Sequence, residues 1–485
     1  MSDITLSSGV RQNLLTLQST ADMMSRTQNR LSTGNKVNSA LDNPNSFFTA
    51  TGLNARGSDL TNLLDDMGQA IQTIKAADEG ITAITKLVES AKAKANQALQ
   101  TQSQFERKAL ATQYNELLGQ IQDLAQDASY KGKNLLAGDG NDLTVLFNED
   151  STSKLKIGAV DFTDSTLAAG LNLSPLEEGA AAGTSFGLAG GTATVTLTGL
   201  QSTSLLTGAA AYAVGDVITV DDGTSTDTLT IAADTTVQDY VNFLKDQPGI
   251  DASFNNDTGA LTIRSNYDVD VDKDTTGGGT AVATAVTAAA LTATSTLVSS
   301  AGFKAGDVIS IKDGNGYEAR KLAIDENTTV QNFVDLINST KGLTAQFAGG
   351  TMIVEGDVDF TISTNNADFN RTEVADTSGT VAIDADDSGF ATDDAINNTV
   401  SAINAALSTL REQASTFGSN LSTVEIRQDF TKKLINTLTE GASKLTLADT
   451  NEEGANLLAL QTRQQLSTTS LSFASQADQA VLRLF

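Results

Sequence analysis

Apolar residues recur at alternating steps of four and three positions over three long runs, and this pattern restricts the fold more than any other feature. The first run covers residues 63–98, the second covers 110–128, and the third covers 396–445. In the third run, Gln428 and Thr431 are the polar interruptions. A seam with a period of 3.5 residues is typical of helices that wind around partner helices. At 1.5 Å per residue, the third run predicts a helix about 75 Å long.

The length of these runs separates two interpretations. Ordinary helices of compact proteins average about 11–12 residues, which is shorter than each of the three runs. We therefore favour a coiled coil over a compact bundle of amphipathic helices. The seam residues that we expect to pack in it are Leu63, Ile74, Ile81, Ile84, Val88, Leu117, Ile121, Ile403, Leu407, Leu410, Phe417 and Leu421.

Weaker apolar stripes mark the two ends of the chain. The N-terminal stripe, with Gln28 as its polar member, consists of Val10, Leu14, Leu17, Ala21, Met24 and Leu31. The C-terminal end has one stripe with Leu471, Ala474, Val481 and Phe485, and a second with Leu466, Phe473, Ala477, Ala480 and Leu484. Two stripes on one short helix require burial on two faces. This favours partners on other chains over packing against the helix's own domain alone.

The middle of the chain shows the alternation of short β-strands, rich in Val, Ile and Thr and interrupted by Gly, Asp and Asn. Residues 143–147 and 155–157 predict a hairpin. Further along, residues 215–220 resemble 306–311, and residues 235–244 resemble 328–337. This repeat predicts two α+β units, at about 190–285 and 286–389, either in tandem or interlocked as a single domain.

The charge follows the same division of the chain. The formal net charge is −28, and residues 151–389 alone carry 11 basic and 32 acidic side chains. With an isoelectric point near 4.2, Coulomb repulsion disfavours binding to nucleic acid or to an anionic bilayer. No run of the sequence approaches 18 consecutive apolar residues. We therefore expect no nucleic-acid partner and no membrane insertion.

The composition excludes most catalytic and metal-binding chemistry. The chain has no His and no Cys, which removes imidazole and thiolate triads, Fe–S clusters and the usual zinc sites. The densest acidic cluster, residues 268–274, fails as a calcium loop because Lys273 and Gly279 stand where Gly and Glu are needed. A carboxylate pair for glycoside hydrolysis stays open in principle, but no pair stands out. We expect no enzyme, no cofactor and no metal site.

The first 30 residues lack the apolar core of a secretory signal peptide. Taken alone, this absence would indicate a cytoplasmic protein.

Several motifs resemble those of bacterial flagellins, the subunits of the flagellar filament. Residues 30–40, Arg-Leu-Ser-Thr-Gly-Asn-Lys-Val-Asn-Ser-Ala, are similar to the N-terminal signature of that family. The opening run with Leu14, Leu15 and Leu17, the segment 130–136 and the closing segment 455–485 are similar as well. The resemblance covers residues 1–150 and 390–485, and residues 41–48 look like the alphaproteobacterial branch.

This resemblance implies an α+β multidomain fold with a long α-helical coiled-coil core from both termini and a β-rich variable outer region inserted between them. Residues 1–42 and 447–485 would form the inner-tube domain, where the terminal stripes become filament-core packing residues. Residues 43–165 and 390–446 would form the long-helix coiled-coil domain with its β-hairpin. Residues 166–389 would form the outer region. The subunit would polymerise into the helical filament used for swimming.

The resemblance also implies partners and a location. The partners are other copies of the chain, a dedicated export chaperone on the C-terminal helix, the type III export apparatus, and the hook-junction and cap proteins. The location is the extracellular filament, reached without a cleaved signal peptide, and the Ser- and Thr-rich outer region would be the place for O-linked glycans. The alternative function is a flagellin-related hook-junction or cell-surface carbohydrate-binding protein, with residues 190–360 as its working part.

Overall fold

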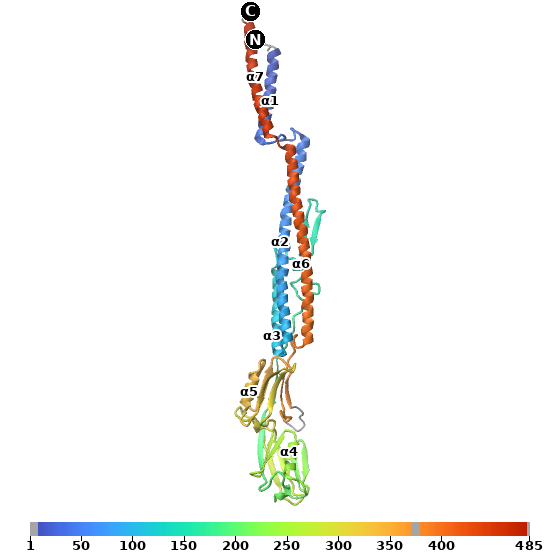
Figure 1. Ribbon diagram of the computed structural model, residues 1–485, viewed down its shortest axis with the longest axis vertical. Helices are drawn as coiled ribbons and strands as arrows, with labels where there is room; N and C mark the ends of the chain where they lie inside the picture. The colour runs from blue at the N-terminus through green and yellow to red at the C-terminus, as the bar shows by residue number, and fades with distance from the viewer. Residues whose placement is uncertain (1–7, 370–378, 483–485) are drawn as a thin grey trace. The chain divides into compact units, whose positions relative to one another are not determined.

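The protein is described by a computed structural model over residues 8–369 and 379–482. Both ends of the sequence form long helices and the middle forms several β-sheets, which confirms the predicted fold class (Figure 1). The chain divides into two compact units. Unit 1 contains the chain up to Thr82, Ala125–Asp161 and the chain from Arg411 onward, and unit 2 contains Ala83–Leu124 and Phe162–Leu410.

Long helices without internal proline dominate both ends of the sequence. Pro44 occupies the first position of its helix, where the missing N–H costs no hydrogen bond. Asp393 and Asp394 begin another helix, where their charge suits the positive end of the helix dipole. The long helices are α1 (Ser8–Thr33), α2 (Pro44–Gln100), α3 (Gln104–Asp127), α6 (Asp393–Thr446) and α7 (Thr450–Leu482).

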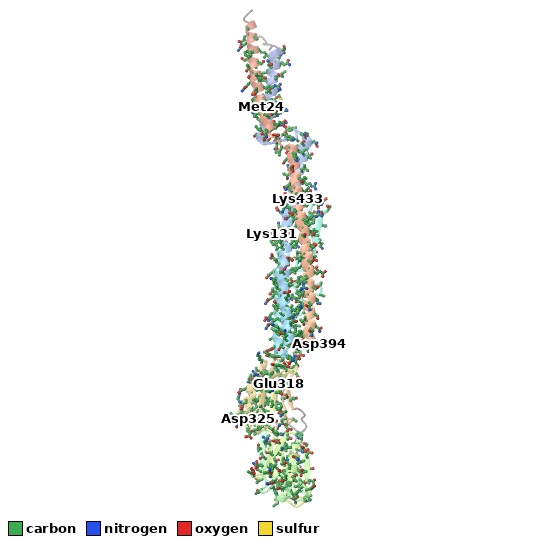
Figure 2. The ribbon with its side chains drawn as sticks, viewed as in Figure 1. Met24, Lys131, Glu318, Asp325, Asp394 and Lys433 are labelled. Atoms are coloured by element: carbon green, nitrogen blue, oxygen red, sulfur yellow. The ribbon has the colours of Figure 1, made fainter. Side chains whose placement is uncertain are left out.

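Helices α1 and α7 pack side by side in unit 1 and run in opposite directions. Arg30, in the last turn of α1, forms an ion pair with Glu453 in the first turn of α7, at 3.1 Å. Thr20 and Thr27 are the buried residues of α1. Met24 lies between them and is half-buried (Figure 2).

Helix α2 runs antiparallel to α6. In unit 1, Lys75 Nζ lies 3.9 Å from Glu425 Oε1. In unit 2, Lys92 Nζ donates a hydrogen bond to Asn404 Oδ1 over 2.7 Å. Within unit 1, a Cβ atom at Gly57 would lie 4.0 Å from Thr439 Oγ1 and one at Gly68 would lie 3.7 Å from Gln428 Nε2, so the residue number of the partner falls along α6 as the number along α2 rises, which fixes the antiparallel direction there.

Gly80 allows a close approach between α2 and the turn that follows α3. A Cβ atom at this position would lie 2.7 Å from the Cβ of Ala128 and 2.9 Å from Cδ1 of Leu136. Glycine in a helix interior costs about 1 kcal/mol relative to alanine. Close packing against Ala128 and Leu136 is the reason that the position has no side chain.

A two-stranded antiparallel hairpin lies beside the helices of unit 1. It consists of β1 (Leu143–Leu146) and β2 (Lys154–Ile157), with Leu143 opposite Ile157 and Leu146 opposite Lys154. Its buried side chains, Val145 and Ile157, point toward the protein and leave the alternate residues to solvent.

The first β module, residues 189–290, packs two four-stranded sheets and a helix around one core. The sheet orders are β11-β4-β8-β7 and β10-β9-β5-β6. Thr236 caps the helix through a capping box with Asp239, in which each residue satisfies a backbone N–H of the other. The elements are β4 (Ala189–Thr196), η1 (Leu206–Gly208), β5 (Val217–Asp221), β6 (Thr226–Thr230), α4 (Val237–Lys245), β7 (Ile250–Asn255), β8 (Ala260–Ser265), β9 (Val269–Lys273), β10 (Val282–Val286) and β11 (Ala289–Ala290).

The second β module repeats this plan in residues 182–188, 291–369 and 379–383. Its sheet orders are β13-β12-β16-β17 and β14-β15-β3. Thr329 caps its helix through a capping box with Asn332. The elements are β3 (Ala182–Gly187), η2 (Leu297–Ser299), β12 (Val308–Asp313), β13 (Glu318–Ala323), α5 (Val330–Asn338), β14 (Leu343–Ala348), β15 (Thr351–Gly356), β16 (Phe360–Thr364) and β17 (Thr380–Ile383).

The first module is inserted within the second. Strand β3 precedes the first module in the sequence, yet it pairs antiparallel with β15 of the second module. Leu188 and Leu291 flank the insertion, both are buried in the second module's core, and Leu291 N donates to Leu188 O over 2.9 Å. The sequence repeat, which begins at Gly215 and Gly306, contained no sign that β3 belongs to the later copy.

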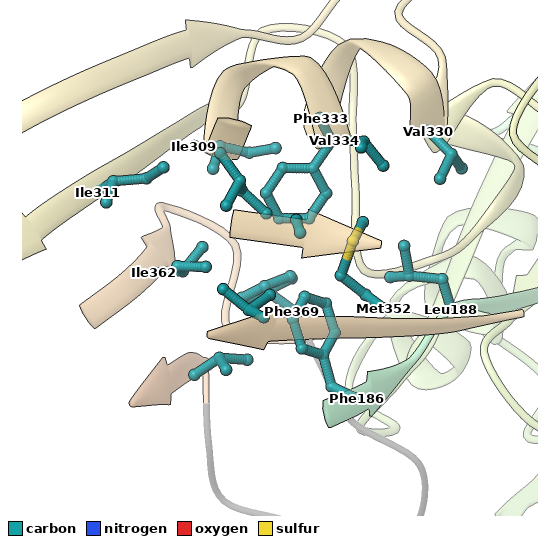
Figure 3. Packing of buried hydrophobic residues seen from close by; sticks show 14 of the residues in the cluster. Phe186, Leu188, Ile309, Ile311, Val330, Phe333, Val334, Met352, Ile362 and Phe369 are labelled. Carbon is teal, nitrogen blue, oxygen red and sulfur yellow. The ribbon is translucent and has the colours of Figure 1, made fainter. Parts of the chain in front are cut away.

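Aromatic rings fill the core of the second module (Figure 3). The ring of Phe186, from β3, lies 5.9 Å from that of Phe369 and 6.2 Å from that of Phe333, measured between centroids. Met352 of β15 is fully buried in the same cluster. Phe186 therefore ties β3 to the module through its side chain as well as through the backbone ladder.

Candidate assembly surface

The apolar seam of α2 faces the interior of the protein. Ile74, Ile81, Ile84 and Val88 are each at most 1% exposed, and Leu63 is half-buried. Removing a side chain of this size from water contributes about 1.5–3 kcal/mol. This face of α2 is used within the chain and is not open to another molecule.

The seam of α6 is buried in a similar way. Ile403, Leu410 and Phe417 are fully buried, Leu407 is 4% exposed, and Leu421 is half-buried. Each seam position of α6 is buried or half-buried.

On α3 the buried residues coincide with the seam at some positions and lie one residue later at others. Ile121 is fully buried and Leu117 is half-buried, whereas Leu118 is 2% exposed and Ala111 and Ala125 are fully buried. Leu117 and Leu118 are both apolar, so the pattern alone could not decide which of them points deeper.

The N-terminal stripe lies beside the contact between α1 and α7 rather than in its centre. Leu14 and Leu31 are 39% and 37% exposed. The remaining members of the stripe, which are all half-buried, are Val10, Leu17, Ala21 and Met24. Thr20 and Thr27, which sequence reasoning missed because they are polar, occupy the centre of the contact.

The two stripes of α7 differ in exposure. Leu471 and Ala474 are half-buried, whereas Leu466 and Phe473 are 67% and 65% exposed. In the second stripe Ala477 and Ala480 are exposed as well. The side chain of Val481 and the residues Leu484 and Phe485 lie outside the described part of the chain.

Exposed large apolar side chains thus recur at intervals of seven or eight residues along α7, on a line beside its contact with α1. Leu458, at 66% exposed, extends the line of Leu466 and Phe473 toward the start of the helix. Leu15 of α1 is exposed to the same extent. Exposed apolar side chains that gather on one face mark surfaces that bind other molecules.

The motif at residues 30–40 forms the link between the terminal helices and the longer ones. Gly34 follows the end of α1 with a φ of +73°, a conformation that favours glycine. Its carbonyl accepts a hydrogen bond from Ala448 N over 2.9 Å, and Lys36 N donates to Thr446 O over 2.7 Å. The loop before α2 and the loop before α7 are therefore held to each other.

Asp42 closes the same loop. Its carboxylate accepts hydrogen bonds from the backbone N–H groups of Asn38 and Ser39, each over 3.0 Å. These two hydrogen bonds lower the pKa of Asp42 below its ordinary value, and the one from Asn38 has the larger effect. The loop is thus organised around an ionised carboxylate at neutral pH.

Two other kinds of feature, a metal-ligand cluster and a membrane-spanning helix, were sought among the described residues. Over residues 8–369 and 379–482, no group of three or more potential ligands is placed to hold a metal ion. Among the described helices, none combines the length and the hydropathy that crossing a bilayer requires.

Two family models match the ends of the chain. Residues 8–141 match the bacterial flagellin N-terminal helical region, and residues 400–485 match the bacterial flagellin C-terminal helical region. Both matches contain helices that carry the surfaces described above.

Curated relatives are similar to the chain over different lengths. Flagellin A of Rhizobium meliloti is 24% identical over 489 aligned residues, which cover 100% of both chains. Flagellin C of Rhizobium meliloti (strain 1021) is 27% identical over 192 residues, which cover 40% of this chain and 55% of that one. The second alignment therefore spans about half of its relative.

Among solved structures, flagellar hook associated protein-3 from Legionella pneumophila is 12% identical. The match covers 90% of this chain and 99% of that chain with a TM-score of 0.20.

Proposed function

We infer that this chain, which belongs to the bacterial flagellins, is a structural subunit that polymerises into the helical filament of the bacterial flagellum. The observation that carries this inference is the line of exposed apolar side chains on α7, with Leu466 and Phe473 at its centre. Helix α7 already packs against α1 on one face and still exposes Leu and Phe on another, so it requires a further partner. In a homopolymer that partner is another copy of the same chain.

Packing between subunits is assigned to the stripes of α1 and α7, and packing within a subunit to the seams of α2, α3 and α6. The partial exposure of Leu14, Leu31 and the α7 line supports the first assignment. The near-complete burial of Ile84 and Ile403 supports the second.

A double variant of the exposed line tests the inference. We expect Leu466→Gln with Phe473→Gln to raise the monomer concentration that coexists with filaments about hundredfold. Burying two such side chains contributes about 3 kcal/mol or more, and 1.4 kcal/mol corresponds to a factor of ten. Sedimentation of polymer and negative-stain electron microscopy measure this concentration. Both side chains are exposed in the single chain, so the pairing of α1 with α7 is retained.

Ser472→Gln is the matched control, because Ser472 is exposed next to Phe473 on the same helix. This variant should polymerise like the wild type. If the double variant also forms filaments at the wild-type concentration, the exposed line of α7 is not the assembly surface.

The proposed domains follow the same division of roles. Residues 1–42 and 447–485 form the inner tube, residues 43–165 and 390–446 form the surrounding helical layer, and residues 166–389 form the outward-facing region. The excess of acidic side chains in residues 151–389 supports an outward position, because it suits a surface in contact with water.

The filament lies outside the cell, and assembly there involves other flagellar components, the hook-junction and cap proteins. Export is proposed to proceed through the type III apparatus without a cleaved signal peptide. An export chaperone would cover the exposed line of α7 before assembly, and the outer region would carry any O-linked glycans. We assign the chain no enzymatic activity.

The alternative role, as a hook-junction or cell-surface carbohydrate-binding protein, gains no support from the aligned relatives, which bear the name flagellin. A saturable ligand for the full chain on a glycan array, together with failure to polymerise, would favour that alternative.

A further inference from the structure

The start of α3 is capped by a residue of the second β module. The backbone N–H of Gln104, the first residue of α3, donates a hydrogen bond to Asp313 Oδ2 over 2.8 Å. Asp313 is 4% exposed and ends β12. A carboxylate at a helix N-terminus satisfies a free N–H group and is favoured by the helix dipole. Asp313 therefore caps the N-terminus of a helix that is remote from it in the sequence.

The side chain of Gln104 adds two contacts to the same region. Its Nε2 donates to Asp387 Oδ1 over 2.7 Å, and its Oε1 accepts from Gly314 N over 3.2 Å. Gln104 is 3% exposed. A buried amide with both ends paired fixes its surroundings, since losing either partner would leave a buried polar group unsatisfied.

One turn further along α3, Arg107 binds the segment that leads into α6. Arg107 is 5% exposed, donates to Ala391 O over 3.1 Å and forms an ion pair with Asp393. Asn315, from the turn between β12 and β13, donates to the same Ala391 carbonyl over 2.9 Å. Helix α3 and the second β module thus both bind the segment that leads into α6.

We propose that the turn between β12 and β13, residues 313–317, is a clasp that fixes the second β module to the helical part of unit 2 in one orientation. The clasp acts beside two other contacts of α3, since Phe105 packs against the core of the second module and Lys108 Nζ donates to Asp357 O over 2.6 Å. The clasp does not rest on polymerisation, because all of its contacts lie within one chain.

The internal repeat supplies a natural comparison. Asp222 corresponds to Asp313, and its Oδ1 accepts backbone N–H groups of its own turn, from Thr224 over 2.8 Å and Ser225 over 2.6 Å. Asp313 Oδ1 likewise accepts from Asn315 and Tyr317 of its own turn.

The two carboxylates differ in their second oxygen. Among the described residues, Asp222 Oδ2 is buried without a hydrogen-bond partner, whereas Asp313 Oδ2 accepts from Gln104. An Asp-initiated turn occurs at the corresponding place in both modules, one residue longer in the second, and only the Asp of the second module caps a helix.

This comparison gives a variant pair that separates the clasp from the turn. In Asp313→Asn, Oδ1 can still close the turn, while the new NH₂ group faces the Gln104 N–H and cannot accept its hydrogen bond. Asp222→Asn makes the same chemical change where no helix is bound. By hydrogen exchange and mass spectrometry of the full-length monomer, we expect peptide 101–107 to exchange about tenfold faster in Asp313→Asn. Asp222→Asn should leave that peptide unchanged.

A distance measurement tests the orientation itself. The chain has no cysteine, so Ala405→Cys on α6 and Glu326→Cys in the second module, both exposed, accept spin labels selectively. We expect one narrow distance distribution by double electron–electron resonance in the labelled parent and with Asp222→Asn. With Asp313→Asn the distribution should broaden markedly.

If Asp313→Asn lowers the module's circular-dichroism signal, Gln104→Ala replaces it, because this change leaves the β12–β13 turn intact. Gln102→Ala, at an exposed glutamine of the same turn between α2 and α3, is its control. The proposal is overturned if the variant that folds keeps both the parent's exchange rate at 101–107 and its narrow distance distribution.

Discussion

Lys273 and Asp216 form an ion pair that is almost completely removed from water. Their side chains are 2% and 0% exposed, and Lys273 Nζ lies 2.7 Å from Asp216 Oδ2. The hydrogen bond from Lys273, together with those from backbone N–H groups such as that of Gly277, lowers the pKa of Asp216 to about 2. In the sequence, Lys273 ends an alternating run of Asp and Val that indicates a strand with one solvated face. Lys273 instead occupies the buried phase of β9, and nothing in the local pattern revealed its distant partner.

We expect Asp216→Asn to lower the thermal midpoint of the first β module, because the ammonium group of Lys273 would stay buried without a counter-charge. The folded pKa of Asp216 is lowered, so its contribution to stability is present above about pH 4 and is lost as the pH falls toward 2. The difference in thermal midpoint between wild type and variant, measured by circular dichroism, should therefore become smaller between pH 4 and pH 2. Asp270→Asn, at an exposed position of the same strand, should show no such difference. A difference that stays constant down to pH 2 would contradict the assignment.

At the scale of the helix, the buried face of α2 follows from the 3.5-residue period, because one apolar line meets one set of partners. On α1 the same reasoning is incomplete. The apolar stripe with Leu14 and Leu31 lies beside the contact between α1 and α7. The centre of that contact is occupied by Thr20 and Thr27. Periodicity states which residues avoid water, but it does not state whether their partner is in the same chain. The strand β3 was not predictable either, since its membership in the second module depends on pairing with a distant strand.

The seam of α2 predicts a clear difference between neighbouring substitutions. Ile84 is fully buried and Lys86 is exposed. We expect Ile84→Ala to reduce the free energy of unfolding by about 2–5 kcal/mol, through lost burial and the cavity that remains. Lys86→Ala should change it by less than about 0.5 kcal/mol. Denaturant titration of the two monomeric variants measures both changes in the free energy of unfolding. Equal changes would show that the seam does not stabilise the subunit.

At the scale of the whole molecule, the insertion of one β module into another sets which part of the chain can be removed. Leu188 and Leu291 lie at the two ends of the insertion and are joined by a backbone hydrogen bond. Both belong to the second module's core. Residues 189–290 thus form a domain whose two ends meet, and such domains tolerate excision.

Replacing residues 189–290 by two glycines should leave the second module folded and polymerisation unchanged. Replacing residues 182–290 in the same way also removes β3 and Phe186, and should unfold the second module. Near-ultraviolet circular dichroism and electron microscopy of both deletions provide the comparison. Equal behaviour of the two deletions would refute the nested arrangement.

The pairing of β3 with β15 also fixes an order of events during synthesis. A ribosome releases the chain from its N-terminal end, so β3 emerges first and its partner strand emerges only after the whole inserted module. The inserted module can complete its sheets while β3 stays unpaired, with Phe186 as its one large apolar side chain. The inserted module can therefore fold before the second module that surrounds it. Until β15 is synthesised, β3 has an unpaired backbone that could pair with a wrong strand.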